Sequence, residues 1–199
     1  MQRVPTMERQ LASYAGIVAS ELLSQITRLG DELRGLRVVH INATPIGGGV
    51  AEILRSLVPL MRSVGIEAEW YAMEADEAFF RISKALHHCL QGDGACPSPE
   101  EIDLYLSHNE EAACSLRAMG VSADLWVVHD VQVLPILSYL GSPTGVWVCH
   151  IDTTRPNEMV RERLLPYMGH YRVIVASMAE YFPEGRASAS NCLLYTSPS

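Results

Sequence analysis

Histidine and carboxylate side chains occur together at two points of the sequence, each directly after a short apolar run. His129 is followed at once by Asp130, and His150 is followed two residues later by Asp152. Imidazoles and carboxylates are the groups that most often transfer protons in enzymes. They also supply the hydrogen-bond donors and acceptors that a hydroxyl-rich ligand requires. The two pairs therefore predict a site for a polar ligand such as a sugar.

A third apolar run ends near His40 and Asn42 and leads into three consecutive glycines, Gly47, Gly48 and Gly49. Glycine lets the backbone approach a ligand closely with its amides exposed. The helix predicted to follow would favour an anion at its N-terminus. We therefore predict a phosphate or sugar site at this loop, with a flexible turn as the alternative.

Two well-known phosphate-binding loops can be tested against this glycine run. A P-loop requires Gly-Lys-Ser/Thr, but Gly49 is followed by Val50, and the single lysine of the chain is Lys84. A dinucleotide fingerprint requires a third glycine where Glu52 stands. Glu74, after the second apolar run, could still act as the ribose-binding carboxylate. A NAD-dependent oxidoreductase therefore stays open as a weaker alternative.

The elements that must position these residues follow from the periodicity of the apolar side chains. Strands are predicted at residues 36–41, 66–73, 124–129, 145–150 and 171–176, and helices at 7–29, 50–64, 77–90, 100–119, 131–139 and 158–168. Apolar strands that alternate with helices predict an α/β domain with a doubly wound parallel sheet. Ligands of such sheets bind beyond the carboxyl ends of the strands, so both His–Asp pairs are expected in one crevice. The alternative for each aspartate is that it caps the next helix.

Composition limits the partners and the compartment. The chain carries 15 Lys+Arg against 23 Asp+Glu, a net charge of −8, which argues against nucleic-acid binding. Its five cysteines are irregularly spaced without a CxxC pair, so we expect reduced thiols and a cytoplasmic protein.

No secretory leader, membrane span or Asp-x-Asp motif is found, and we expect no membrane partner, no metal and no cofactor. His87 and His88 are adjacent on a predicted helix and are interpreted as surface and core rather than as metal ligands.

Several of these segments together resemble one enzyme family. His40-Ile41-Asn42-Ala43-Thr44, leading to Gly47-Gly48-Gly49-Val50-Ala51-Glu52-Ile53-Leu54, is similar to the first βα unit of trehalose synthase and trehalose phosphorylase-like enzymes. These are retaining glycosyltransferases of family 4 with the GT-B fold. The segments from Phe79-Phe80 to Gly92, His129-Asp130-x-Gln132 and Cys149 to Asn157 fit the same group. The likeness covers residues 36–183.

The resemblance implies a two-domain enzyme that transfers glucose, with retention, from a nucleotide-sugar or sugar-phosphate donor to a glucose-like acceptor. The N-terminal domain would hold the acceptor, and its glycine loop would face the donor phosphate. The C-terminal donor-binding domain would be missing from this sequence, so we expect the chain alone to be inactive. The residues expected to be catalytic are His150, Asp152 and His129, and those expected to bind substrate are Gly47, Gly48, Gly49, Asn42, Asp130, Gln132 and Asn157.

We expect three segments along the chain. Residues 1–35 would form an N-terminal helical segment, 36–185 a Rossmann-like acceptor domain, and 186–199 a disordered or artefactual tail that resembles translated sequencing-adaptor sequence. A non-catalytic sugar- or nucleotide-binding module is the main alternative to an enzyme domain. A homodimer stays open.

Overall fold

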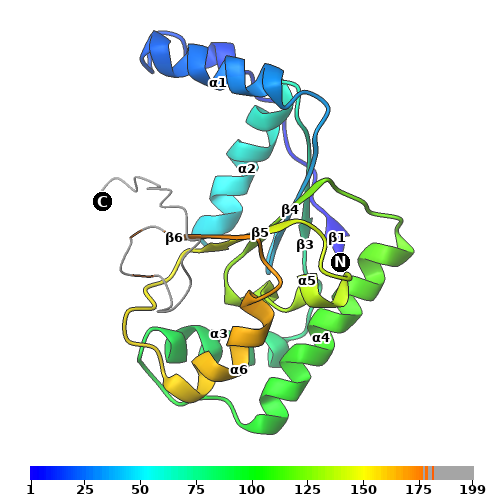
Figure 1. Cartoon of the computed structure of the whole chain (residues 1–199), viewed down its shortest axis with the longest axis vertical. Coiled ribbons are helices and arrows are strands. Elements are labelled where there is room, and N and C mark those ends of the chain that lie inside the picture. The colour runs from blue at the N-terminus through cyan, green and yellow to red at the C-terminus, as the bar shows by residue number, and fades with distance from the viewer. Residues whose placement is uncertain (177, 179–180, 182–199) are drawn as a thin grey trace.

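The computed structural model contains one six-stranded sheet, and it describes residues 1–176, 178 and 181 (Figure 1). The strands are β1 (Gln2–Arg3), β2 (Arg37–Asn42), β3 (Glu67–Ala72), β4 (Leu125–His129), β5 (Gly145–Cys149) and β6 (Val173–Ala176). Their order across the sheet is β1-β3-β2-β4-β5-β6, and only β1 pairs antiparallel to its neighbour. The predicted α/β class is confirmed, and all five predicted strands are present.

Helices cover the two faces of the sheet. The helices are α1 (Ser20–Glu32), α2 (Gly49–Ser63), α3 (Glu77–Leu90), α4 (Pro99–Ala118), α5 (Ile136–Tyr139) and α6 (Glu158–Met168), with short 3-10 turns η1 (Leu11–Tyr14) and η2 (Val131–Val133). On one face, Leu54 and Val58 of α2 pack with Trp70 of β3. The opposite face carries the larger core, which includes Phe79 of α3 and Trp147 of β5. The sheet therefore lies between α2 on one side and α3–α6 on the other, while α1 extends beyond the end of α2 (Figure 1).

The chain leaves the sheet in opposite directions after β2 and after β4. The strand that follows β2 in sequence lies on one side of it, whereas the strands that follow β4 continue on the other side. Open α/β sheets bind their ligands where the strand order reverses in this way. The topology therefore points to the carboxyl ends of β2 and β4 as the place to search for a site.

The helix predicted over 7–29 is wrong in its first half. Residues Leu11–Tyr14 form a 3-10 turn, and α1 begins only at Ser20. Gly16 lies between them with a φ of +82°, a left-handed conformation that an α-helix cannot include. The interpretation of 1–35 as a helical segment also missed β1, a two-residue strand that no periodicity could reveal.

The predicted helix over 131–139 is two short elements, η2 and α5. Pro135 stands between them, and its ring removes the backbone N–H that a continuous helix would use.

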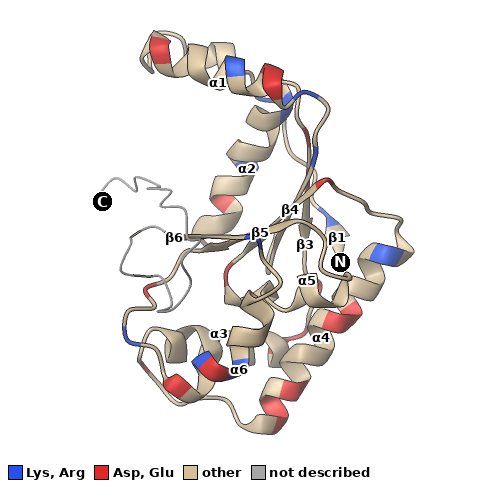
Figure 2. Ribbon diagram, viewed as in Figure 1, with Lys and Arg blue, Asp and Glu red and all other residues tan. Residues whose placement is uncertain are grey.

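Acidic residues lie along α4 (Figure 2), in keeping with the net charge. No helix within the described residues is long and apolar enough to cross a bilayer. The predicted tail at 186–199, with Cys192, lies outside the described residues.

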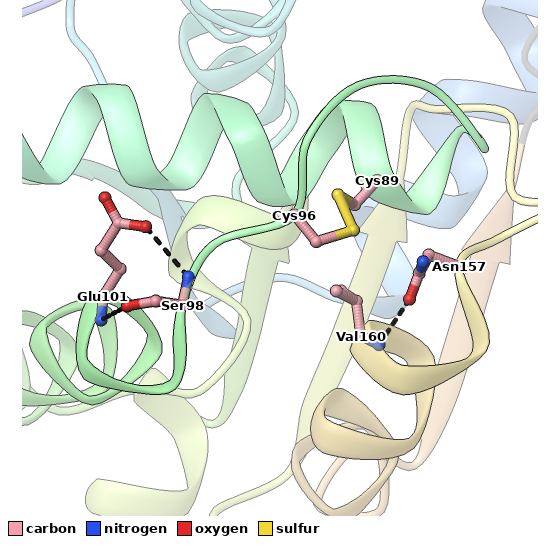
Figure 3. Close-up of a disulfide and its surroundings, with 6 residues drawn as sticks. All are labelled: Cys89, Cys96, Ser98, Glu101, Asn157 and Val160. Atoms are coloured by element: carbon pink, nitrogen blue, oxygen red, sulfur yellow. Dashed lines mark hydrogen bonds between the residues drawn. A yellow bond between two sulfur atoms is a disulfide. The ribbon is translucent and has the colours of Figure 1, made fainter.

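The expectation that all cysteines are reduced is wrong, because Cys89 and Cys96 form a disulfide. Cys89 ends the buried stripe of α3, and the turn at Gly92, with a φ of +86°, returns the chain so that the two Cα atoms lie 5.6 Å apart. Figure 3 shows the bridge beside the start of α6, where the Asn157 amide donates to the Cys89 carbonyl at 2.9 Å. Cys149 is a free buried thiol and Cys114 a free exposed one.

Candidate functional site at the carboxyl edge of the sheet

A cavity of about 220 Å³ opens where the strand order reverses. The loop after β2, the start of α2, the residues after β4 and one side chain of α3 line it. Its lining residues are Asn42, Ala43, Thr44, Gly47, Gly48, Gly49, Val50, Ala51, His87, His129, Asp130 and Gln132. Seven of the predicted site residues thus meet around one space.

Two other hollows are larger but less suited to a ligand. One of about 310 Å³ lies between η1, α1 and the end of α2. Another of about 280 Å³ lies at the amino ends of β2 and β3, next to Arg37 and Glu67. Both are far from the carboxyl edge at which open α/β sheets place their ligands. We therefore take the smaller cavity as the candidate site.

The glycine loop gives this cavity a wall of bare backbone. Gly47 and Gly48 have φ values of +76° and +81°, which residues with a Cβ rarely adopt. Gly48 is the N-cap of α2, and no side chain caps the helix there. A Cβ added at any of the three glycines would meet no atom within 4 Å. The first amides of α2 have no side-chain cap and can therefore receive an anion.

Two neighbouring glycines allow a matched test of this geometry. We expect Gly48→Ala to destabilise the fold by about 1–3 kcal/mol, because φ +81° and ψ 155° form a region that only glycine occupies comfortably. Gly49→Ala places the same methyl group at the first helical residue, where space is open. It should leave stability unchanged or raise it slightly, because alanine favours the helix. Chemical denaturation of both variants checks the prediction, and equal stabilities would contradict it.

Asn42 supports the loop as well as lining the cavity. Its side-chain oxygen accepts a 2.7 Å hydrogen bond from the buried Trp70 indole, and its amide donates to the Thr44 carbonyl at 2.7 Å. Trp70 is confirmed as a core residue, and its N–H fixes the orientation of the Asn42 amide. Asn42 therefore holds the first turn of the glycine loop in place.

Asp130 has a strained backbone that three hydrogen bonds hold. Its φ is +63°, unusual for a residue with a side chain. Its amide donates to Val148 O at 2.9 Å, its carbonyl accepts from the Trp147 indole at 3.0 Å, and its Oδ1 accepts from the His150 amide at 2.8 Å. Burial raises the pKa of this carboxyl, and the nearby His150 lowers it. Strain that its surroundings enforce in this way is typical of functional sites.

His129 is a buried residue of the cavity lining, and both of its ring nitrogens have a partner. Nε2 lies 3.1 Å from Nδ1 of His40, and Nδ1 lies 3.1 Å from Nε2 of His150. Burial lowers the pKa of His129 well below its usual value, and it lowers that of His40 to about 4. The two buried imidazoles are therefore neutral at pH 7. His129 therefore has no free ring nitrogen to offer to a ligand.

The sequence interpretation missed His87. It lies on α3 and was assigned to the surface or core, but the structure places it in the cavity lining opposite the glycine loop. Burial lowers its pKa, while the Asp130 carboxylate raises it. The helix periodicity identified the buried stripe of α3, but it could not show which part of that stripe faces the crevice.

The remaining predicted residues lie outside the cavity lining. His150 is half-buried and reaches the cavity only through His129 and Asp130. Asp152 is exposed, and its carboxylate accepts from the amide and hydroxyl of Thr154, which lowers its pKa. Asn157 caps α6 by accepting from the Val160 amide at 3.3 Å (Figure 3). Helix capping, the alternative to a ligand site, is therefore the observed role of the Asn157 side chain. The Asp130 side chain caps no helix.

No group of three or more His, Cys, Asp or Glu side chains that could hold a metal ion occurs in the part of the chain that the structure describes. The imidazoles of His40, His129 and His150 are arranged in a line, with ring nitrogens directed at one another rather than at a common centre.

The arrangement of loop, cavity and strand-end residues can now be compared with known proteins. Residues 40–183 match the family model described as trehalose synthase, N-terminal domain. The chain belongs to this family. The resemblance to trehalose synthase seen in the sequence is confirmed.

Curated members of the trehalose synthase family align with most of this chain. It is 42% identical over 189 residues to the trehalose synthase of Rubrobacter xylanophilus, an alignment that covers 93% of the chain and 45% of the relative. It is 38% identical over 176 residues to the trehalose synthase of Pyrococcus horikoshii, covering 87% of the chain and 42% of the relative. The chain thus spans less than half the length of these relatives.

A solved structure supports the fold of this trehalose synthase N-terminal domain. The α,α-trehalose 6-phosphate synthase of Burkholderia multivorans superposes with a TM-score of 0.54 at 19% identity. The superposition covers 73% of this chain and 41% of that one. At this identity the likeness concerns the fold alone.

Proposed function

We propose that this chain is the acceptor-side domain of a retaining glucosyltransferase that forms trehalose or a related glucoside. The donor would be an NDP-glucose or a glucose phosphate, and glucose the acceptor. The observation that carries the proposal is the cavity at the strand-order reversal, where an uncapped helix N-terminus faces Asp130 and Gln132. Family membership supports the same conclusion.

The chemistry of the cavity suits the two halves of such a reaction. Transfer of glucose builds positive charge at the anomeric carbon and negative charge on the departing phosphate. The exposed amides of Gly49 and Val50 can stabilise that phosphate, since they lie at the positive end of α2. The Asp130 carboxylate and the Gln132 amide can hydrogen-bond sugar hydroxyls.

The size of the cavity supports a site shared with a second domain. Ligand pockets commonly hold ~300–1,000 Å³, whereas this one holds about 220 Å³ and is open. The space suits a monosaccharide better than a nucleotide sugar. The described residues that line the cavity include no lysine or arginine, so most of the positive charge for a diphosphate would come from the second domain.

Two experiments test the proposal. Calorimetric titration of the chain with glucose should show saturable binding, while NADH should show none; tight NADH binding would favour the oxidoreductase alternative. Fusion to the remaining part of the Rubrobacter xylanophilus trehalose synthase should give an enzyme that forms an α-linked product from an α-configured donor. Glucose binding without any transfer by the fusion would favour the non-catalytic module.

In that fusion, His150→Ala should lower the rate of transfer by on the order of 100-fold while the chain still folds, because it removes the imidazole that contacts His129 and keeps the backbone amide that donates to Asp130. Transfer rates with glucose as acceptor and circular dichroism of the variant measure the two effects. An unchanged rate would remove His150 from the site.

A further inference from the structure

Three histidines form a continuous row across the sheet. We call His40, His129 and His150 the histidine row. Successive ring centroids are 5.4 Å apart, with interplanar angles of 25° and 15°, and the facing nitrogens are 3.1 Å apart at both contacts. These are two stacked, hydrogen-bonded ring pairs rather than an incidental cluster.

The register of the strands creates this row. His40 of β2 is opposite Val127 of β4, and His129 lies two residues further along β4. His129 is opposite Val148 of β5, and His150 lies two residues beyond it. Residues two apart in a strand point to the same face. The row therefore runs diagonally on one face of the sheet, from under α2 towards the carboxyl edge.

At the His40 end, the histidine row contacts a group that can only accept a hydrogen bond. Nε2 of His40 lies 3.3 Å from Sδ of Met61, on α2. A thioether has lone pairs and no proton to donate. The nitrogen that faces it therefore carries the hydrogen, since an imidazole lone pair directed at the sulfur would be repelled.

The Met61 sulfur determines which nitrogen donates and which accepts in each hydrogen bond of the histidine row. A neutral imidazole has one N–H and one lone pair. With the proton on Nε2 of His40, its Nδ1 must accept from Nε2–H of His129. Nδ1 of His129 must then accept from Nε2–H of His150. His150 is left with a lone pair on Nδ1, and it is the least buried ring of the row.

We propose that His40 and His129 are positioning residues whose row, closed by Met61, holds His150 in the Nε2–H tautomer. His150 then offers Nδ1 as an acceptor to a ligand hydroxyl. The acceptor role of Nδ1 rests on the proposed function, because it requires a hydroxyl-bearing ligand. The tautomer itself does not depend on any ligand.

Long-range ¹H–¹⁵N NMR spectra of the histidine side chains in the unliganded chain test the tautomer. All three rings of the row should show the Nε2–H pattern. The Nδ1–H form at His150, or averaging between the two forms, would overturn the proposal.

A matched pair of methionine variants tests the role of the sulfur. Met61→Leu keeps the volume and removes the acceptor, so His150 should lose its single tautomer. Met168→Leu, in the core at the end of α6, should leave the spectrum of the row unchanged. An unaltered His150 in Met61→Leu would overturn the role of Met61. If that variant fails to fold, His40→Leu removes the acceptor for His129 and should produce the same loss at His150.

Glucose titration of the same samples separates this proposal from the proposed function. Met61→Leu should weaken glucose binding roughly two- to tenfold, the net effect of one hydrogen bond. If His150 shows the Nε2–H tautomer but the chain does not bind glucose, the proposed function is contradicted and the proposal for the histidine row stands. If the chain binds glucose but His150 carries its proton on Nδ1, the proposal for the histidine row is overturned and the proposed function stands.

Discussion

Asp130→Asn should lower glucose transfer on the order of 100-fold, measured as kcat/KM of the fused enzyme, while the fold keeps its stability. The side-chain oxygen that accepts from the His150 amide at 2.8 Å is retained in asparagine, so the local geometry survives. What disappears is the negative charge beside the cavity, and charged hydrogen-bond acceptors are the strong ones. Asparagine has the same shape as aspartate, so the strained backbone at φ +63° and ψ 177° should cost the variant no more than it costs the parent chain.

The stability of this variant follows from the pKa of Asp130. Burial raises that pKa, so the ionised carboxyl is less favourable in the folded chain than in the unfolded one. The folded state therefore loses stability as the pH rises from the ordinary pKa of aspartate through the raised pKa of Asp130 in the folded chain. Removal of the charge should leave the free energy of unfolding at pH 7 equal or higher. A variant that keeps or gains stability but loses activity is typical of a residue whose role is functional rather than structural.

Asp124→Asn is the matched control at the opposite edge of the sheet. Asp124 precedes β4 and makes an ion pair with Arg37 at 2.7 Å, and the Arg37 guanidinium lowers its pKa to about 2. This variant should lose some stability at pH 7 and keep full activity. Transfer by Asp130→Asn at the rate of the unchanged enzyme would exclude Asp130 from the site.

Acidification from pH 7 to pH 4 should remove roughly 3 kcal/mol of stability through His40 alone. Burial lowers the pKa of His40 from 6.5 to about 4. Between these values the unfolded chain binds a proton that the folded chain does not, so the free energy of unfolding falls as the pH falls. The loss begins near pH 6.5 and is nearly complete at pH 4.

Two neighbours modify this acid dependence. Burial also lowers the pKa of His129, which adds a loss of the same sign. Asp130, with its raised pKa, adds a smaller gain at low pH, because its folded form binds a proton earlier than the unfolded form. We expect the histidines to dominate, since two of them are buried with lowered pKa values.

Urea unfolding at several pH values between 7.5 and 4 measures the effect. His40→Asn should flatten the curve, because a titrating group with a lowered pKa is removed. Equal slopes for the parent chain and His40→Asn would show that folding does not lower the pKa of His40.

The sequence was sufficient for five of the strands, for most of the helices and for much of the cavity. Helices α3 and α6 have the predicted bounds, and the ends of β2 to β6 lie close to the predicted ones. Apolar periodicity determines these elements locally, and the rule that ligands bind at the carboxyl edge then groups the residues after β2 and β4. Asn42, the glycines, His129, Asp130 and Gln132 follow from these two steps and lie around the cavity.

Contacts that depend on register and helix rotation could not be predicted. The histidine row requires His129 to lie two residues beyond the partner of His40, and a sequence does not state which residues are opposite in parallel strands. The position of His87 depends on how α3 is rotated against the sheet. The Cys89–Cys96 bridge depends on the path of the loop after α3, for which the spacing of the cysteines gave no signal.

The short strand β1 covers the carboxyl half of the outer edge of β3. Gln2 and Arg3 pair with Ala72 and Tyr71 of β3, and the Val4 amide extends the pairing to the Trp70 carbonyl at 2.8 Å. Without this ribbon, β3 would present a row of free amides and carbonyls to neighbouring chains, which is how edge strands aggregate. Two residues of antiparallel strand thus shield that edge of the sheet from intermolecular pairing.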